Sequence, residues 1–198
     1  KNVAEKVSKY LLETHHNHIK EDRKKEMTNR EVEISDLQMK FFYKTFGKKP
    51  KDGWSMYISM HGGGQVEAEY NDQQWENQKT LYSIEEGVYL VPRAPTNTWD
   101  LWHQVHIDTF FHHIIQNVIV HLDVDPNKVY IMGYSAGGDG VYQLAPRMAD
   151  RLAAAAMMAG HPNETSPLGL RNIGFTIHMG ENDTPYSRNT VAIDWKKQ

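Results

Sequence analysis

From residue 54 onward, short apolar segments alternate with longer segments of helical character. This alternation predicts βαβ units, which build a mostly parallel sheet with helices on both faces. Ahead of it, EVEI and the aromatic-rich QMKFFYKTFG favour two further strands. The predicted fold class is therefore α/β, with about seven strands. We expect the strands at residues 31–34, 38–46, 54–60, 87–91, 128–132, 152–160 and 172–180, and the main helices at 71–82, 100–121 and 136–150.

Local signals refine some of these elements. Asn71 or Asp72 is expected to cap the helix at 71–82. The segment VDPN predicts a turn before the next strand. That strand, KVYIM at 128–132, is short and apolar, so we expect it to be buried on both faces of the sheet. The two apolar segments that follow it are expected to be buried strands as well.

Residues 1–30 are polar and dense in charge, unlike the rest of the chain. Their apolar positions recur with a helical period, which predicts a helix packed on the surface of the domain. We therefore divide the chain into an N-terminal charged helical segment, 1–30, and one domain, 31–198. The stretch HHNH at 15–18 lacks a carboxylate pattern beside it and does not predict a metal site. The apolar positions that give residues 1–30 their helical period are Val3, Val7, Tyr10 and Leu11.

Composition narrows the classes of function. A chain of 198 residues with 39% hydrophobic residues can build one sizeable core. A net charge of −3 and a sequence pI of about 6.4 favour neither nucleic acid nor an anionic membrane as a partner. No apolar run reaches about 18 residues, so no transmembrane segment is expected. Cysteine is absent, which excludes disulfides and thiol nucleophiles.

The sequence leaves localisation and oligomeric state open. The chain begins at Lys1, and a removed signal segment is neither shown nor excluded. No cofactor and no metal are expected, because neither H-E-x-x-H nor another ligand pattern is present.

Ligands of parallel α/β sheets bind beyond the carboxyl ends of the strands. We therefore expect the functional site among the residues that directly follow each predicted strand. These strand-end segments are HGGG (61–64), PRAPTNTW (92–99), GYSAGG (133–138), GHPNE (160–164) and GENDTPY (180–186).

GYSAG at 133–137 matches the pattern G-x-S-x-G between a predicted strand and a predicted helix. In that context Ser135 occupies a sharp turn that exposes its Oγ atom, and Gly133 and Gly137 remove Cβ clashes around the turn. The first turn of the helix then directs backbone N–H groups at the site. Ser135 is our candidate nucleophile. The alternative is a glycine-rich turn with a capping serine.

Acyl transfer also needs donors aimed at a developing oxyanion. The N–H of Ala136, directly after the serine, is one candidate. In HGGG the amides are unobstructed by side chains, so we expect Gly63 and Gly64 to supply the others. His61 is expected to anchor this loop rather than to act as a base, although its place after a strand also makes it a candidate to line the site.

The order strand–HGGG, strand–GxSxG–helix and strand–GxxD resembles the α/β-hydrolase fold, whose sheet usually has eight strands. Within that fold, the chain resembles the esterases grouped with poly(3-hydroxybutyrate) depolymerases and dienelactone-hydrolase-like enzymes. The resemblance covers about residues 31–198 and includes MHGGG, MGYSAGGDG and GENDTPY. It implies Ser135 as the nucleophile and Asp183 as the acidic member of a catalytic triad, with Glu181 as the fallback.

The resemblance also implies a histidine after one more strand, but no histidine follows His178. One interpretation is that this chain is the C-terminally incomplete part of a longer enzyme, and the other is a degenerate hydrolase. We favour the first because the serine, the glycines and Asp183 are retained. His161 follows a strand and is expected to line the site. The histidines of the helix at 100–121 are expected to be core or surface residues.

Two further residue types belong near the expected site. Trp99 is expected to form an apolar wall of the cleft, whereas Trp75 and Trp102 are expected in the core. Asp139 lies one turn into the helix after the serine, and a favourable interaction with the helix N-terminus accounts for it.

These features together predict a serine hydrolase that cleaves a small-molecule or polymeric carboxylic ester through an acyl-enzyme. One alternative is a peptidase or acyltransferase, because the fold and the serine motif do not determine the substrate. Another is a noncatalytic binding module on a degenerate hydrolase scaffold.

Overall fold

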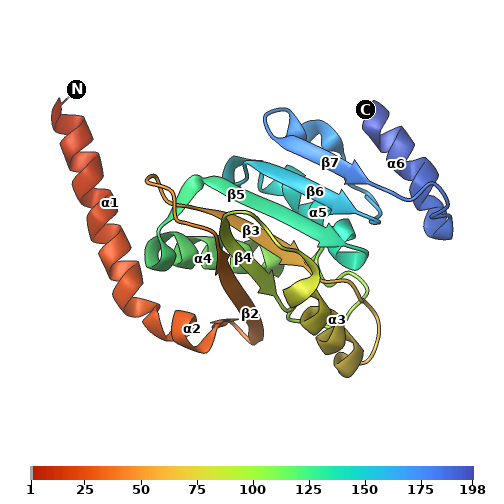
Figure 1. Cartoon of the computed structure of the whole chain (residues 1–198), viewed down its shortest axis with the longest axis horizontal. Coiled ribbons are helices and arrows are strands. Elements are labelled where there is room, and N and C mark those ends of the chain that lie inside the picture. Colours follow the sequence, from red (N-terminus) through yellow and green to blue (C-terminus); the bar gives the residue numbers. More distant parts are fainter. Residues whose placement is uncertain (1) are drawn as a thin grey trace.

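The computed structural model describes residues 2–198, and a single sheet runs through it (Figure 1). The strands are β1 (Glu31–Ile34), β2 (Leu37–Phe46), β3 (Trp54–Met60), β4 (Gly87–Pro92), β5 (Val124–Tyr134), β6 (Ala154–Met158) and β7 (Gly174–His178). The α-helices are α1 (Asn2–Asp22), α2 (Lys24–Asn29), α3 (Ala68–Leu81), α4 (Val105–Leu122), α5 (Ala136–Arg147) and α6 (Arg188–Lys197).

The strand order is β1-β2-β4-β3-β5-β6-β7. β2 runs antiparallel to both of its neighbours, and all pairs from β4 to β7 are parallel. The prediction of a mostly parallel sheet of about seven strands is therefore confirmed. Parallel neighbours place the carboxyl ends of β3, β5, β6 and β7 at one edge of the sheet, where the strand-end segments meet.

Helices cover both faces of the sheet. Successive side chains of a strand point to opposite faces, so neighbouring residues of β3 contact helices on different sides. On one face, Gln78 of α3 donates from Nε2 to Ser59 Oγ (2.7 Å) and accepts from Tyr89 OH at its carbonyl oxygen (2.6 Å). On the other face, the next residue of β3, Met60, approaches Gly140 of α5 and belongs to the hydrophobic core. This packing fixes the start of α5, and with it Ser135.

The structure differs from the sequence predictions at several element boundaries. α3 begins at Ala68, so Asn71 and Asp72 lie inside the helix and the prediction of a cap there was wrong. VDPN does not form a separate turn, because β5 begins at Val124 and takes up these residues as an irregularity in its pairing with β3.

Three strands, β5, β6 and β7, are less buried than predicted. In β6, Ala155 and Met157 are buried and the other three residues are half-buried. Buried and half-buried residues alternate along KVYIM, so β5 is fully covered on one face only. On its other face Tyr130 stacks on Tyr57 with ring centroids 4.9 Å apart. β7 is the last strand of the sheet, and its residues are half-buried or exposed. Apolar composition alone does not distinguish an edge strand from a central one.

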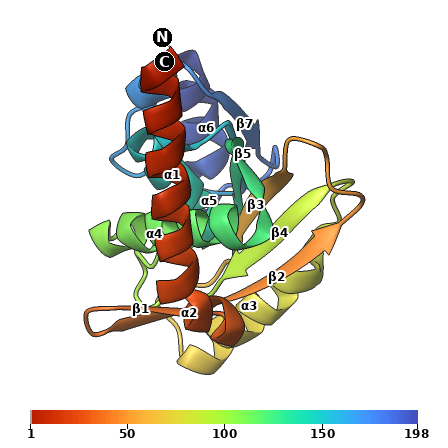
Figure 2. The same ribbon diagram turned by 90° about the vertical axis from the view of Figure 1, so that its left-hand side faces the viewer.

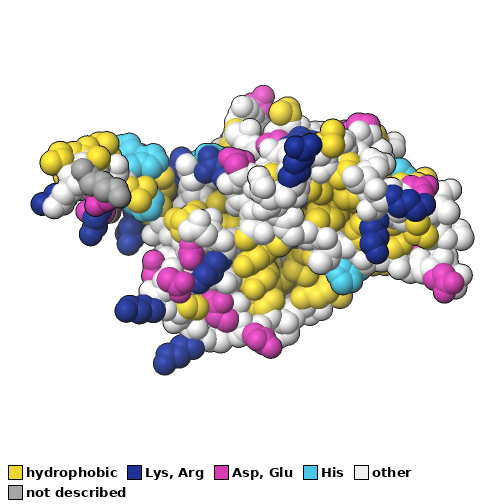
Figure 3. All heavy atoms as spheres, turned by 90° about the horizontal axis from the view of Figure 1, so that it is seen from above, with side chains coloured by type: hydrophobic (Ala, Val, Ile, Leu, Met, Phe, Trp, Pro, Cys, Tyr) yellow, Lys and Arg dark blue, Asp and Glu magenta, His cyan; other side chains and the backbone are white. Residues whose placement is uncertain are grey.

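α1 projects from the domain instead of packing along it (Figures 1 and 2). The helix was predicted correctly, but its apolar positions are exposed, with exposed fractions of 51% for Val7 and 76% for Val3. Figure 3 shows apolar and histidine side chains on the surface of this projecting segment. The buried residue of α1 is Ile19, near its C-terminal end. In α2, Glu26 accepts from Asn117 Nδ2 of α4 (2.7 Å), which ties this end to the domain.

The division into a helical segment, 1–30, and a domain, 31–198, stays a prediction.

Between Asn2 and Gln198, no helix combines the length and the apolar character that crossing a membrane requires.

Candidate active site

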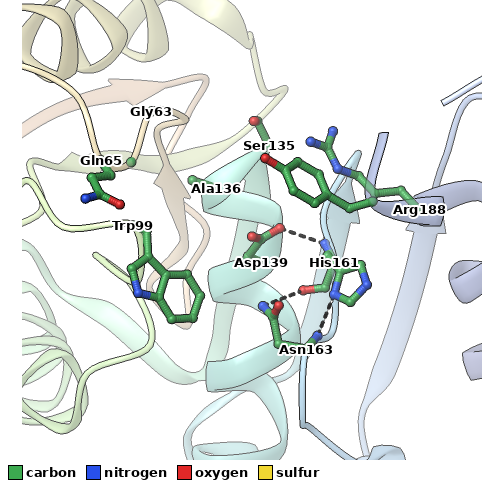
Figure 4. Close-up of a pocket in the computed structure, with 11 residues that line it drawn as sticks. Gly63, Gln65, Trp99, Ser135, Ala136, Asp139, His161, Asn163 and Arg188 are labelled. Atoms are coloured by element: carbon green, nitrogen blue, oxygen red, sulfur yellow. Dashed lines mark hydrogen bonds between the residues drawn. The ribbon is translucent and has the colours of Figure 1, made fainter. Parts of the chain in front are cut away.

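A cavity of about 500 Å³ opens beyond the carboxyl ends of the parallel strands (Figure 4). All five strand-end segments contribute to its wall. Of the residues predicted for the site, the cavity brings together Gly63, Gly64, Trp99, Ser135, Ala136 and His161. Its wall also contains Gln65, Asp139, Asn163, Tyr186 and Arg188.

Ser135 forms the turn between β5 and α5 with φ 57° and ψ −121°. A side chain at positive φ is strained, so this backbone is held by its surroundings. Its N–H donates to Met158 O (3.0 Å), and a Cβ atom on Gly133 or Gly137 would clash with the backbone of Gly137 or of Met60, respectively. The side chain of Ser135 makes no capping hydrogen bond to α5, which argues against the alternative of a capping serine.

The HGGG loop lies directly against this turn. A Cβ atom on Gly62 would be 3.3 Å from Ser135 Cβ. Gly63 and Gly64 have φ values of 116° and 132°, which only glycine adopts without strain. The N–H of Gly64 donates to Asn71 Oδ1 (3.1 Å). That amide is engaged within the protein, so we revise the prediction that Gly64 binds an oxyanion.

His61 lies beneath the loop, and it is not among the described residues that line the cavity. Its Nε2 atom accepts from the N–H of Ala94 (3.1 Å), and Nδ1 lies 2.6 Å from Gly62 O. The Nδ1 atom therefore carries the proton of a neutral ring. Burial lowers the pKa of His61 to about 4, which keeps the ring neutral. The indole of Trp102, in the core, donates to His61 O (3.0 Å) and completes this anchor.

Asp139 reaches the cavity from the first turn of α5. Its Oδ1 atom accepts from the N–H of His161 (2.6 Å), and burial raises the pKa of Asp139 to about 6. The carboxylate thus links α5 to the segment after β6. The expected interaction with the N-terminus of α5 is therefore not its only role. His161 accepts from the N–H of Asn163 at its Nδ1 atom (2.9 Å), so Nε2 carries the proton of the neutral ring.

Asp183 follows β7, as predicted, but it is not among the residues of the described chain that line the cavity. Its carboxylate pairs with the guanidinium of Arg188, with Nη1–Oδ1 at 3.5 Å. Arg188 lines the cavity (Figure 4), so Asp183 is connected to the cavity wall through this ion pair. The fallback residue, Glu181, is exposed, and its carbonyl oxygen accepts from Asn189 Nδ2 (2.8 Å).

Some elements of a complete hydrolytic site are not seen within residues 2–198. In this part of the chain, no histidine is hydrogen-bonded to Ser135. The same residues hold no cluster of three or more histidine or carboxylate side chains that could bind a metal ion.

Sequence reasoning missed several residues of the cavity wall. Asn163 and Tyr186 lie in strand-end segments where the site was expected, but no pattern singled them out within those segments. Gln65 directly follows HGGG. Asp139 and Arg188 lie on helices, and no local pattern marks which helical side chains turn toward a cavity.

A family model described as the dienelactone hydrolase family matches residues 92–195, which is more than half of the chain. This range includes Ser135 and Asp183 but not the HGGG loop. None of the curated proteins matches the sequence.

Solved structures share the fold. The crystal structure of a thermostable esterase has a TM-score of 0.63 and 16% identity, with 84% of this chain and 48% of that chain covered. For the BES protein from Bacillus cereus these values are 0.61, 9%, 84% and 78%, and for a ferulic acid esterase they are 0.50, 15%, 82% and 86%. The chain therefore has the α/β-hydrolase fold, and it spans about half the length of the thermostable esterase.

Proposed function

Because this chain belongs to the dienelactone hydrolase family, we propose that it is a serine hydrolase that cleaves carboxylic esters through an acyl-enzyme on Ser135. The observation that carries the proposal is the backbone of Ser135, held at φ 57° in the wall of the cavity. Strain of this kind costs about 1–3 kcal/mol and persists where the surroundings impose it. It is typical of the exposed nucleophile on a strand-to-helix turn.

In the first half of the reaction, Ser135 Oγ attacks the ester carbonyl carbon and gives its proton to a base. The carbonyl oxygen becomes an oxyanion, which the N–H groups of Ala136 and Gly63 bind in our proposal. When the tetrahedral intermediate collapses, the alcohol leaves with the proton from the base. Water then attacks the acyl-enzyme by the same route, releases the carboxylic acid and restores the serine.

We propose that the base is a histidine outside residues 1–198, oriented by Asp183. His161 is the alternative inside the chain, since it lines the same cavity. Its geometry disfavours this role: Nδ1 already accepts from Asn163, and Nε2 then carries a proton and has no free lone pair. Asp183 already pairs with Arg188, but a carboxylate has about four lone-pair sites, so it can accept from a histidine while this ion pair stays in place.

The test is the hydrolysis of p-nitrophenyl acetate and butyrate by the full natural protein. We expect Ser135→Ala to lower kcat by about 10³-fold or more, since the nucleophile is lost. We expect Asp183→Asn to lower kcat by at least about 10²-fold without a matching rise in KM. Equal rates for wild type and Ser135→Ala would refute the assignment.

The absence of a histidine hydrogen-bonded to Ser135 in residues 2–198 supports a second candidate, a noncatalytic binding module. The same assay separates the two functions. A folded natural protein that hydrolyses neither ester above the buffer rate would contradict the first function and favour the second.

A further inference from the structure

Besides the anchor at His61, the side chain of Asn71 holds the HGGG loop. Asn71 lies on α3 and is fully buried. Its amide forms a pair of hydrogen bonds with one residue of the loop: Oδ1 accepts from Gly64 N–H (3.1 Å), and Nδ2 donates to Gly64 O (3.0 Å). A Cβ atom on Gly63 would clash with Asn71 Oδ1. The glycine and the asparagine therefore fit each other, and the amide takes the place that a side chain would fill.

Asn71 is itself held from the opposite side. Its second Nδ2 hydrogen is donated to Asn97 Oδ1 (3.0 Å). The same oxygen accepts from Arg93 Nη2 (2.6 Å), and Arg93 Nε donates to Asp72 Oδ1 (2.7 Å). The network therefore connects α3, the segment after β4 and the HGGG loop. Because both hydrogens and the oxygen of the Asn71 amide are used, the orientation of the side chain is determined.

We propose that Asn71 is a positioning residue that fixes the HGGG loop against Ser135, so that the N–H of Gly63 meets the oxyanion. This inference rests on the proposed function, because it assigns a role within that same site. It accounts for the engagement of Gly64: this residue is the point at which the loop is held, and its neighbour is left to bind the substrate. A displacement of about 1 Å in such a donor can lower the rate about 100-fold.

Asn71→Asp is the most direct variant, because it keeps the shape and the Oδ1 acceptor but removes both donors. The new carboxylate faces three acceptors, Gly64 O, Val66 O and Asn97 Oδ1, so we expect the loop to move away. Asn97→Ala removes the outer support from an exposed position, where folding is less at risk. Asn77→Asp is the matched control, since it makes the same change on the exposed face of α3.

The kinetic test compares these variants in the natural protein with p-nitrophenyl acetate. We expect Asn71→Asp to lower kcat by about 10- to 100-fold with KM changed less than about threefold, because a donor for the transition state is displaced. Asn97→Ala is expected to lower kcat by about 3- to 10-fold, and Asn77→Asp to stay within about twofold of wild type. If kcat of both Asn71→Asp and Asn97→Ala matched that of Asn77→Asp, the inference would be overturned.

Hydrogen–deuterium exchange of residues 61–66 provides a readout that does not depend on activity. We expect the amides of this segment to exchange at least about tenfold faster in Asn71→Asp and Asn97→Ala than in Asn77→Asp. Unchanged exchange would overturn the inference even if the rate fell. If Asn71→Asp does not fold, Asn97→Ala decides the question by both measurements. A wild type without Ser135-dependent turnover would instead overturn the proposed function, while the exchange still tests whether Asn71 holds the loop.

Discussion

Ser135 combines a strained backbone conformation with a side chain in the wall of the cavity. The conformation with φ 57° and ψ −121° exposes the side chain in the cavity wall, but a Cβ atom at this φ is strained. Glycine adopts the same conformation without that penalty. The serine is therefore retained at the expense of stability, which is common for residues that perform chemistry.

A pair of substitutions measures this strain. We expect Ser135→Gly to raise the free energy of unfolding by about 1 kcal/mol, since the strain is relieved, whereas Ser135→Ala keeps the Cβ atom and gains nothing comparable. Urea unfolding of the two variants gives the difference. A glycine variant less stable than the alanine variant would show that the turn is not strained.

Asp139 is a second residue whose native environment lowers the stability of the protein. Burial raises the pKa of this carboxyl to about 6, from an ordinary value of 3.8. The native state therefore holds its proton more tightly than the unfolded state does. Stability falls as the pH rises from 3.8 through 6 and stays at the lower level above that range.

We expect Asp139→Asn to be more stable than wild type by about 1–3 kcal/mol at pH 8, because the asparagine needs no buried charge. The amide oxygen can still accept from the N–H of His161. At pH 4 the two proteins should differ little. Urea unfolding at both pH values checks this, and an equal difference at pH 8 and pH 4 would show that ionisation is not the cause.

Among the helices, α1 is the one whose surroundings the sequence did not predict. The exposed apolar residues belong to the N-terminal half of α1. Figure 1 shows this half extending beyond the sheet. The buried contacts come later, from Ile19 and from Met27 of α2. Periodicity shows that a helix has an apolar face, but it does not show whether the fold brings anything against it.

Two truncations distinguish these halves. Deletion of residues 1–15 is expected to change the Tm by less than about 3 °C, because few buried contacts are lost. Deletion of residues 1–29 removes Ile19, Met27 and the contact of Glu26 with Asn117, and we expect the Tm to fall by about 5–10 °C. Equal effects of the two deletions in a thermal melt would contradict this account of α1.

The sequence predicts the strands and the strand-end segments well, because apolar periodicity and glycine patterns are local. For this reason the sequence could place Ser135 and the HGGG loop in the same site, and both line the cavity. The engagement of Gly64 and the burial of Asn71 could not be predicted, since they depend on how α3 packs against a loop seven residues away. The edge position of β7 likewise depends on strand order, which is set by the whole sheet.

At the scale of the molecule, burial sets the response to acid. It lowers the pKa of His61 to about 4, and it lowers the pKa of four further histidines. As the pH falls, the histidines of the unfolded chain bind protons near pH 6.5, whereas those of the native state bind them only at lower pH. Stability contributed by the neutral rings is therefore complete above pH 6.5 and is lost as the pH falls toward 4. The further histidines are His103, His106, His112 and His121.

Asp139 has the opposite effect over much of this range. We therefore expect the free energy of unfolding of Asp139→Asn to fall by at least about 2 kcal/mol from pH 7 to pH 5, and that of wild type to fall by less. Denaturant titrations at the two pH values measure both slopes. A steeper loss in wild type than in Asp139→Asn would contradict the assignment of these two buried groups.

The central claim is that Ser135 is the nucleophile of an ester hydrolase. The most direct measurement is mass spectrometry of the natural protein after reaction with a fluorophosphonate, with the modified residue located by peptide mapping. We predict one phosphonyl group per chain, on the peptide that contains Ser135, with loss of ester hydrolysis in proportion to labelling. A protein that hydrolyses esters while Ser135 stays unmodified would contradict the claim.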